Sequence, residues 1–250
     1  MTTARSALLL SGGPHPFAET TPLLEALLAG AGYDVQVVES PSQAAMALEA
    51  ADPDLWVCNT LRWRMLAPKY DDTREEFAYE IDVDSARRIE AWVTGGGRLL
   101  ALHAAPICFD NWDGWGELIG ARWDWDRSWH PPVGAIRVEL VAEHQLTEGL
   151  EDFTVLDEAY RDMWVAADVE PLAVSRWDDR AHPLLWVREV GDGVVVTCTL
   201  GHGPESFRHP THRRLLERAV ELLGEHPGAD RSRDRGSPMP ENHSPNGATP

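Results

Sequence analysis

The sequence has few features that would tie it to a membrane or to a nucleic acid. No apolar run approaches the length of a membrane span, and the run at residues 7–10 is too short for the core of a signal peptide. Lys and Arg number 22 against 41 Asp and Glu, and the formal charge of -19 opposes binding to phosphate backbones or anionic lipid surfaces. We therefore expect a cytoplasmic protein with a small-molecule partner, and neither a nucleic-acid nor a membrane partner.

Cysteines are few, and the common catalytic motifs are missing. The 3 cysteines, Cys58, Cys108 and Cys198, lie far apart without C-x-x-C spacing, so they provide neither a disulfide framework nor a cysteine zinc motif. The chain has no H-E-x-x-H, P-loop or G-x-S-x-G motif, and no G-x-G-x-x-G follows a strand. The sequence thus gives no support for a standard metalloprotease, NTPase, α/β-hydrolase or dinucleotide-binding protein.

Short apolar runs alternate with amphipathic segments in the first hundred residues. The runs at 6–11, 35–38, 55–58 and 99–102 are typical of strands buried on both faces. Helices are predicted between them: one capped by Thr20 or Thr21 with Pro22 at its first position, then 42–50 and 82–93. This alternation predicts a parallel sheet with right-handed crossovers.

The second half of the chain is richer in β structure. The segment 61–80 has no clean periodicity and is predicted to be a surface excursion, and 111–119 to hold a short helix. Residues 133–141, 171–177, 183–189 and 194–200 are predicted strands, the last two joined in an antiparallel hairpin by Gly191-Asp192-Gly193. The predicted fold class is α/β, a mostly parallel sheet flanked by helices with an antiparallel β extension.

The chain ends in two segments of opposite character. An amphipathic helix is predicted after His209-Pro210, with apolar residues from Leu215 to Leu223. From residue 226 the composition turns to Pro, Gly, Ser, Asn and Arg. We expect an α/β domain over residues 1–225 and a disordered tail over 226–250, because the tail has too little apolar surface to bury.

Three histidines follow predicted strands: His15 the first, His103 the fourth and His202 the last. Ligands bind at the carboxyl ends of parallel strands, so His15 and His103 are predicted to share one crevice, which His202 joins if its strand runs parallel to theirs. A structural hydrogen bond is the simpler interpretation of any single one. Together they are candidates for acid–base groups or for ligands of a divalent metal, although their spacing alone does not argue for a metal.

The segment Asp157-Glu158-x-Tyr160 places two carboxylates and a phenol within four residues. In an extended segment Glu158 and Tyr160 point to one side and Asp157 to the other. Glu158 and Tyr160 can then face a ligand together while Asp157 anchors a backbone group or a histidine. A surface turn with a half-buried tyrosine is the alternative.

Five tryptophans lie between residues 112 and 129, in a loop rich in Asp and Gly. Apolar rings beside carboxylates suit a sugar, whose C–H faces stack on aromatic rings while its hydroxyls bind charged acceptors. Core packing is the alternative for each ring, and it is the interpretation of Trp56, Trp92 and Trp186. The predicted ligand contacts from this loop are Trp112, Trp115, Trp129 and His130. His209, in the loop before the last predicted helix, is a further predicted contact.

Three stretches resemble the ThuA-like family, named for trehalose utilisation: GGGRLLALHAA, HQLTEGLEDFTVLDEAY and GDGVVVTCTLGHGPESFRHPTHRRLLERAVELL. Their order and spacing match the family from Ser6 to Gly224. The resemblance implies a flavodoxin-like fold, similar to class I glutamine amidotransferase domains, and a role in sugar metabolism. The strand end that bears a cysteine in amidotransferases bears His103 here, so glutaminase activity is not implied. His144-Gln145 departs from the His-Pro often found in the family.

The leading hypothesis is an enzyme that acts on a sugar or keto-sugar derivative by isomerisation, or by hydrolytic or lyase-type cleavage. In this hypothesis His103 is the general base or a metal ligand, with His15 and His202 as its acid partner or co-ligands. Glu158 and Tyr160 hold hydroxyls, and Asp157 orients a histidine. The alternative is a non-catalytic carbohydrate-binding or regulatory module with an amidotransferase-like fold. The sequence leaves open the substrate, the metal and whether the protein is a homo-oligomer.

Overall fold

The computed structural model describes residues 5–225, and the expectation of a disordered tail at 226–250 lies outside them. No helix in this range is long and apolar enough to cross a membrane. The elements, in chain order, are β1 (Arg5–Gly12), α1 (Phe17–Gly30), β2 (Tyr33–Val38), α2 (Pro41–Ala51), β3 (Leu55–Thr60), η1 (Pro68–Tyr70), α3 (Asp71–Phe77), α4 (Val83–Thr94), β4 (Arg98–Leu102), η2 (Ala105–Ile107), α5 (Asp113–Ile119), β5 (Ala121–Arg122), β6 (Gly134–Leu140), β7 (Phe153–Asp157), β8 (Trp164–Val165), β9 (Ala173–Trp177), β10 (Arg180–Val190), β11 (Gly193–Cys198), α6 (Pro204–Arg208) and α7 (Pro210–Glu225).

A 9-stranded sheet runs through the described part of the chain in the order β2-β1-β3-β4-β11-β10-β9-β6-β7. The pairs from β2 to β11 are parallel, and those from β11 to β7 are antiparallel. The predicted α/β fold with its antiparallel extension is therefore confirmed. Four reversals of direction separate β11 from β7, so β7 runs in the same direction as the parallel strands and its carboxyl end points to the same edge of the sheet.

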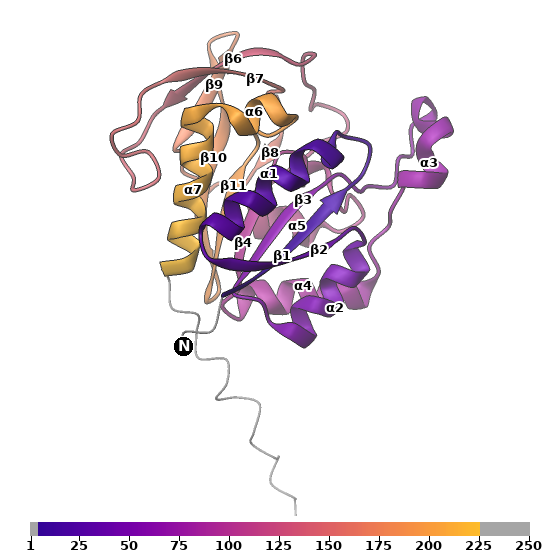
Figure 1. Ribbon diagram of the computed structural model, residues 1–250. Coiled ribbons are helices and arrows are strands. Elements are labelled where there is room, and N and C mark those ends of the chain that lie inside the picture. The colour runs from indigo at the N-terminus through magenta and orange to yellow at the C-terminus, as the bar shows by residue number, and fades with distance from the viewer. Residues whose placement is uncertain (1–4, 226–250) are drawn as a thin grey trace, which may run out of the picture.

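Helices cover both faces of the parallel strands, which explains why the strands are continuously apolar. Along β1, Ala7 and Leu9 belong to the core under α1 and α7, whereas Leu8 and Leu10 belong to the core under α2, α4 and α5. Figure 1 shows α1, α6 and α7 grouped together, with α2 and α4 beside each other elsewhere on the sheet. The carboxyl ends of the strands remain as the edge at which side chains can meet.

The first helix begins earlier than its predicted cap. It starts at Phe17, so Pro22 lies inside it and not at its first position. Phe17 and Thr20 are both buried, and Thr20 therefore packs within the helix where the sequence suggested a cap exposed at its end. The prediction of a Thr20 or Thr21 cap was wrong because the buried side of this helix extends back to the loop that carries His15.

The segment 61–80 is more ordered than predicted. It contains η1 and α3, and its first residues are buried: Leu61, Trp63 and Met65 pack with Phe17 and Ala104 in a small apolar cluster. The alternation of buried and partly exposed residues from 61 to 65 is that of an extended chain lying on the strand ends. This segment forms one wall of the pocket described below.

Candidate functional site

Four side chains from separate parts of the chain meet at the carboxyl edge of the sheet. His15 follows β1, His103 follows β4, His202 follows β11 and Glu158 follows β7. One potential ligand atom from each lies within 4.8 Å of the others, the only such group of His, Cys, Asp and Glu found within residues 5–225. The condition set for His202 is met, because β11 pairs in parallel with β4.

Two glycines allow the histidine loops to approach the strand ends. Gly13 has φ +126°, and a Cβ there would lie 2.3 Å from the carbonyl oxygen of Leu61. Gly201 has φ +124°, and its added Cβ would lie 3.0 Å from the ring of Phe207. The chain can therefore bring His15 and His202 over His103 only with glycine at these positions.

The tautomer of His103 follows from its hydrogen bonds. Its Nδ1 lies 3.1 Å from the carbonyl oxygen of Thr199, which can only accept, so Nδ1 carries the proton. Nε2 is then an acceptor, and the hydroxyl of Tyr160 lies 3.2 Å from it. Burial lowers the pKa of His103 and raises that of Tyr160 well above its ordinary value. Near neutral pH the ring is uncharged and the phenol protonated.

Glu158 lies among histidines, and this arrangement sets its charge. Its Oε2 is 3.1 Å from Nδ1 of His202 and 3.7 Å from Nε2 of His103, while its Oε1 is 3.3 Å from Nδ1 of His130. Burial by itself would raise the pKa of Glu158, but the contact with His202 and the charges of the other rings bring it below the ordinary value. The same contact raises the pKa of His202. The site thus holds one carboxylate and one histidine that readily carries a proton.

His15 stays neutral in this cluster. Burial and, to a smaller extent, the neighbouring rings of His103 and His202 together lower its pKa to about 3. Its Nδ1 is buried and has no hydrogen-bond partner among the described residues. Nδ1 of His202 is close to Glu158 but is not oriented for a hydrogen bond to it. Two ring nitrogens of the cluster therefore have lone pairs or protons that the protein itself does not satisfy.

These features fit a divalent metal ion. Three imidazoles and one carboxylate are ligands that Zn²⁺ and other divalent first-row metals prefer. Ligands held about 2.1 Å from an ion lie roughly 3 to 3.4 Å from their neighbours, close to the 3.1 Å between His202 and Glu158. A histidine ligand usually donates its other N–H to a backbone carbonyl or carboxylate, as His103 does to Thr199. His15, His103, His202 and Glu158 are thus the residues that would hold the ion.

A pocket of about 450 Å³ opens over this cluster. Its polar floor includes His15, Glu158, Tyr160 and His130. The volume is within the range of small-molecule sites, about 300 to 1,000 Å³. A bound molecule of this size would place its reacting atoms against the histidines and the carboxylate.

Aromatic rings form the two walls of the pocket. Trp63 and Tyr70 come from the segment before α3, and their rings meet edge to face at 5.2 Å. Trp123, Trp125 and Trp129 come from the loop after α5. Flat apolar walls above a polar floor match the two kinds of surface that a sugar presents.

Sequence reasoning placed only some of the ligand contacts in this pocket. Trp129 and His130, two of the predicted contacts, line it. Trp115 does not, because it is 1% exposed, packs against Trp56 and donates its N–H to the backbone of Ala105.

Two further predicted contacts also lie outside the pocket lining. Trp112 packs against Trp115, with ring centres 6.3 Å apart. His209 stacks on Phe153 at 4.9 Å. These two side chains and Trp115 support the fold at the positions where a ligand contact was predicted.

Asp157 is buried behind the cluster and does not face the pocket. It has 0% exposure, and its carboxylate accepts the backbone N–H groups of Glu158, Gly201 and His202 at 2.7, 2.7 and 3.0 Å. It therefore cannot contact a ligand directly, which corrects its place among the catalytic residues. The predicted anchoring role fits the structure, through the backbone of His202 and not through its ring.

The walls also contain residues that sequence reasoning did not select. Trp123 and Trp125 belong to the tryptophan-rich loop but were not singled out from it. Trp63, Lys69 and Tyr70 lie in the segment predicted to be an irregular surface excursion. The available signal was the density of aromatic residues in that segment, which a solvated excursion does not require.

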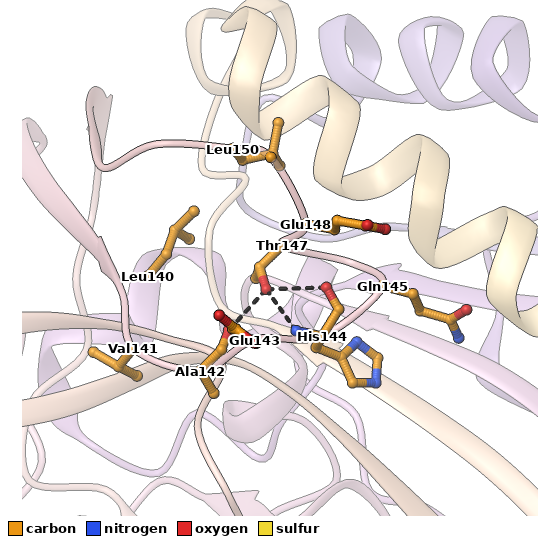
Figure 2. Close-up of a pocket in the computed structure, with 10 residues that line it drawn as sticks. Leu140, Val141, Ala142, Glu143, His144, Gln145, Thr147, Glu148 and Leu150 are labelled. Carbon is orange, nitrogen blue, oxygen red and sulfur yellow. Dashed lines mark hydrogen bonds between the residues drawn. The ribbon is translucent and has the colours of Figure 1, made fainter.

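A larger hollow, of about 680 Å³, lies elsewhere and is formed by a single loop, residues 140–150. Figure 2 shows Thr147 at its centre, with its hydroxyl bonded to the carbonyl of Ala142 and to the backbone of His144. These bonds hold the loop in a tight turn. The polar groups at its centre bond within the loop, so we place the functional site at the smaller pocket, where several strands converge.

The cysteines are not arranged for nucleophilic chemistry. All three are buried, and burial raises the pKa of Cys108 and of Cys198 to about 12 and that of Cys58 well above its ordinary value. None of them forms a thiolate at neutral pH.

Comparison with known proteins agrees with this architecture. A family model described as ThuA, trehalose utilisation, matches residues 7–222. A ThuA-like protein from Parabacteroides merdae superimposes with a TM-score of 0.69 at 16% identity, over 92% of this chain and 93% of that chain. A cytoplasmic protein from Salmonella typhimurium gives a TM-score of 0.62 at 15% identity, over 87% and 99%. A β-galactosidase from Rahnella gives 0.57 at 17% identity, over 88% of this chain but only 31% of its own. A search among curated proteins gave no match.

Proposed function

Because the chain belongs to the ThuA family, described by trehalose utilisation, we propose that it is an enzyme that acts on a sugar or keto-sugar derivative. The reaction class is proton transfer at a sugar carbon or oxygen, as in isomerisation, hydrolysis or elimination. The cytoplasm is the proposed location, in keeping with structural neighbours called cytoplasmic proteins.

One observation carries the proposal. Three histidines and a carboxylate converge beneath a pocket whose walls are aromatic, and two members of this group, His15 and Glu158, line the pocket. A carbohydrate-binding module needs the aromatic walls but has no use for His15, whose buried Nδ1 has no hydrogen-bond partner among the described residues. Perturbed titratable groups gathered in a pocket are typical of catalytic sites.

The proposed roles follow from the contacts. His15, His103, His202 and Glu158 would hold a divalent metal, which supplies Lewis acidity toward a carbonyl or hydroxyl oxygen. Tyr160 is protonated and donates to Nε2 of His103, 3.2 Å away; with a metal on Nε2 this hydroxyl would be released to donate to a substrate oxygen.

His130 serves the outer side of the cluster. It lies 3.3 Å from Glu158, lines the pocket and is partly exposed, so it can contact both a substrate and solvent. The aromatic walls orient the ring of the sugar and exclude water.

The test is a screen of sugars and 3-keto-sugars followed by product mass, with wild-type protein and Glu158→Gln. We expect turnover of at least one compound by the wild type and a loss of 100-fold or more, about 2.7 kcal/mol, in the variant. His209→Gln is the control, because it removes a histidine that lies outside the pocket. Metal content is measured on protein prepared without a histidine tag, where a stoichiometric divalent ion is expected.

Two results would contradict the proposal. Sugar binding without product in the presence of each divalent metal would favour the non-catalytic module. Equal turnover by Glu158→Gln and wild type would show that the cluster takes no part in the reaction.

A further inference from the structure

Behind the cluster lies a row of buried polar side chains that the proposed chemistry does not use. Asp157 ends β7, Ser206 lies in α6, His212 in α7 and Cys198 ends β11. None is more than 1% exposed. Buried polar groups are costly unless each has a hydrogen-bond partner, so their arrangement calls for an explanation.

In each hydrogen bond of this row, the donor and the acceptor can be assigned in only one way. Nδ1 of His212 lies 3.0 Å from the backbone carbonyl of Ser206 and 2.9 Å from its hydroxyl, and because the carbonyl can only accept, Nδ1 carries the proton. Nε2 is then the acceptor that faces the thiol of Cys198, 3.7 Å away. The hydroxyl of Ser206 gives its own proton to Oδ2 of Asp157. The row therefore runs from the thiol through the imidazole and the hydroxyl to the carboxylate.

The carboxylate at the end of the row holds two members of the cluster. Oδ2 of Asp157 also accepts the N–H of Gly201, and Oδ1 accepts the N–H groups of His202 and Glu158. His202 and Glu158 follow different strands, β11 and β7, which are not neighbours in the sheet. One carboxylate thus joins the two chain segments whose side chains meet at 3.1 Å.

We propose that Ser206 and His212 are positioning residues for the site, which hold Asp157 in the orientation that sets Glu158 beside His202. This inference rests on the proposed function in one respect: the side chains that the row positions are those of the proposed site. His212 fixes the hydroxyl of Ser206, the hydroxyl fixes one carboxylate oxygen, and the carboxylate fixes the two backbone segments. Neither residue touches the pocket, and each acts through Asp157.

The first test needs no variant. In ¹⁵N-histidine NMR spectra of the wild-type protein, His212 should be the Nδ1–H tautomer. An Nε2–H tautomer or a charged ring at neutral pH would overturn the proposal, because either state breaks the direction of the row.

The second test uses Ser206→Ala. The variant should fold, because Nδ1–H of His212 keeps the backbone carbonyl of residue 206 and Oδ2 of Asp157 keeps the N–H of Gly201. We expect the amides of Gly201 and His202 to exchange with solvent about tenfold faster and the imidazole resonances of His202 to shift. We also expect Co²⁺ to bind about tenfold more weakly, at the low end of the effect of outer-shell groups on metal affinity.

Ser175→Ala is the matched control. Ser175 is also buried, at 2% exposure, but its partner is Arg161 in the antiparallel extension. A purely structural role for Ser206 would make the two variants alike, with lower thermal midpoints and unchanged exchange at Gly201 and His202, and that result would overturn the proposal.

If neither wild type nor variant binds Co²⁺, the amide exchange and the His202 resonances still decide the question. Failure of the proposed metal is thereby separated from failure of the positioning role.

Discussion

The neutral state of His15 predicts a definite pH dependence of stability. Its pKa in the folded protein is about 3, against 6.5 for an ordinary histidine. Below pH 6.5 His15 is protonated in the unfolded chain but not in the folded protein. The stability associated with this residue is therefore present above pH 6.5 and is lost as the pH falls toward 3. Each pH unit is worth about 1.4 kcal/mol, which gives roughly 2 kcal/mol between pH 7 and pH 5 and about 5 kcal/mol in full.

The perturbation is His15→Gln, which cannot be charged. Urea unfolding is followed by tryptophan fluorescence at pH 7 and pH 5, with EDTA present so that metal does not compete with protons. Between these two values the variant should lose about 2 kcal/mol less stability than the wild type. His202, whose pKa is raised, contributes with the opposite sign in both proteins. A variant that loses as much stability as the wild type would refute the assignment of a buried, neutral His15.

Three further outcomes are expected. Lys69 is the only lysine of the chain and lines the pocket, so a bound sugar should slow its acetylation, read by peptide mass, while the α-amino group reacts as before. Trp115→Phe should lower the thermal midpoint and leave sugar affinity unchanged, whereas Trp123→Phe should weaken binding at an unchanged midpoint; the reverse would move the ligand away from the pocket. Asp82 caps α4 through Ser85 N–H at 2.8 Å, so Asp82→Ala should cost about 1 kcal/mol in urea unfolding, and Asp82→Asn, which keeps the acceptor, much less. Hydrogen bonds from the hydroxyl and the backbone N–H of Ser85 lower the pKa of Asp82, so its contribution to stability is present above the ordinary pKa and fades as the pH falls through the folded value.

The histidines of the site could be predicted because the parallel strands are legible in the sequence. Strands buried on both faces are continuously apolar, and parallel strands end at one edge, so the residues after β1 and β4 had to be neighbours. The position of Glu158 beside these histidines could not be predicted in the same way. It depends on the four reversals from β11 to β7, and the β-like runs of the sequence do not state which of them pair.

The tryptophans show a signal that was available and not used. Trp115, Leu118 and Ile119 follow helical spacing, which places all three on the buried side of α5. That spacing separates Trp115 from Trp123, which lies beyond the helix in the pocket wall. Crowding of aromatic residues in the sequence therefore pointed to the loop that lines the pocket, and periodicity would have removed the ring that belongs to the core.

Asp157 marks a limit that no local pattern could pass. Alternation along β7 correctly placed it opposite Glu158, but three of its hydrogen-bond donors, Gly201, His202 and Ser206, are 44 to 49 residues away in sequence. Until these donors are known, a carboxylate next to a catalytic candidate is equally compatible with facing a ligand and with anchoring the backbone. The fold class needed only local patterns, whereas the division of labour between Asp157 and Glu158 needed tertiary contacts.

His103 follows a buried strand in an uncommon backbone conformation. The residue has φ +41°, an uncommon conformation for a non-glycine residue, directly after a buried strand. Such a strained strand end can present a nucleophile, but here the ring is fixed by Thr199 on one side and by Tyr160 on the other, so Nε2 faces the cluster. Cys108, five residues later, is buried with a pKa of about 12 and gives no replacement thiolate. The same backbone feature therefore presents a neutral imidazole nitrogen, suited to hold a metal or accept a proton.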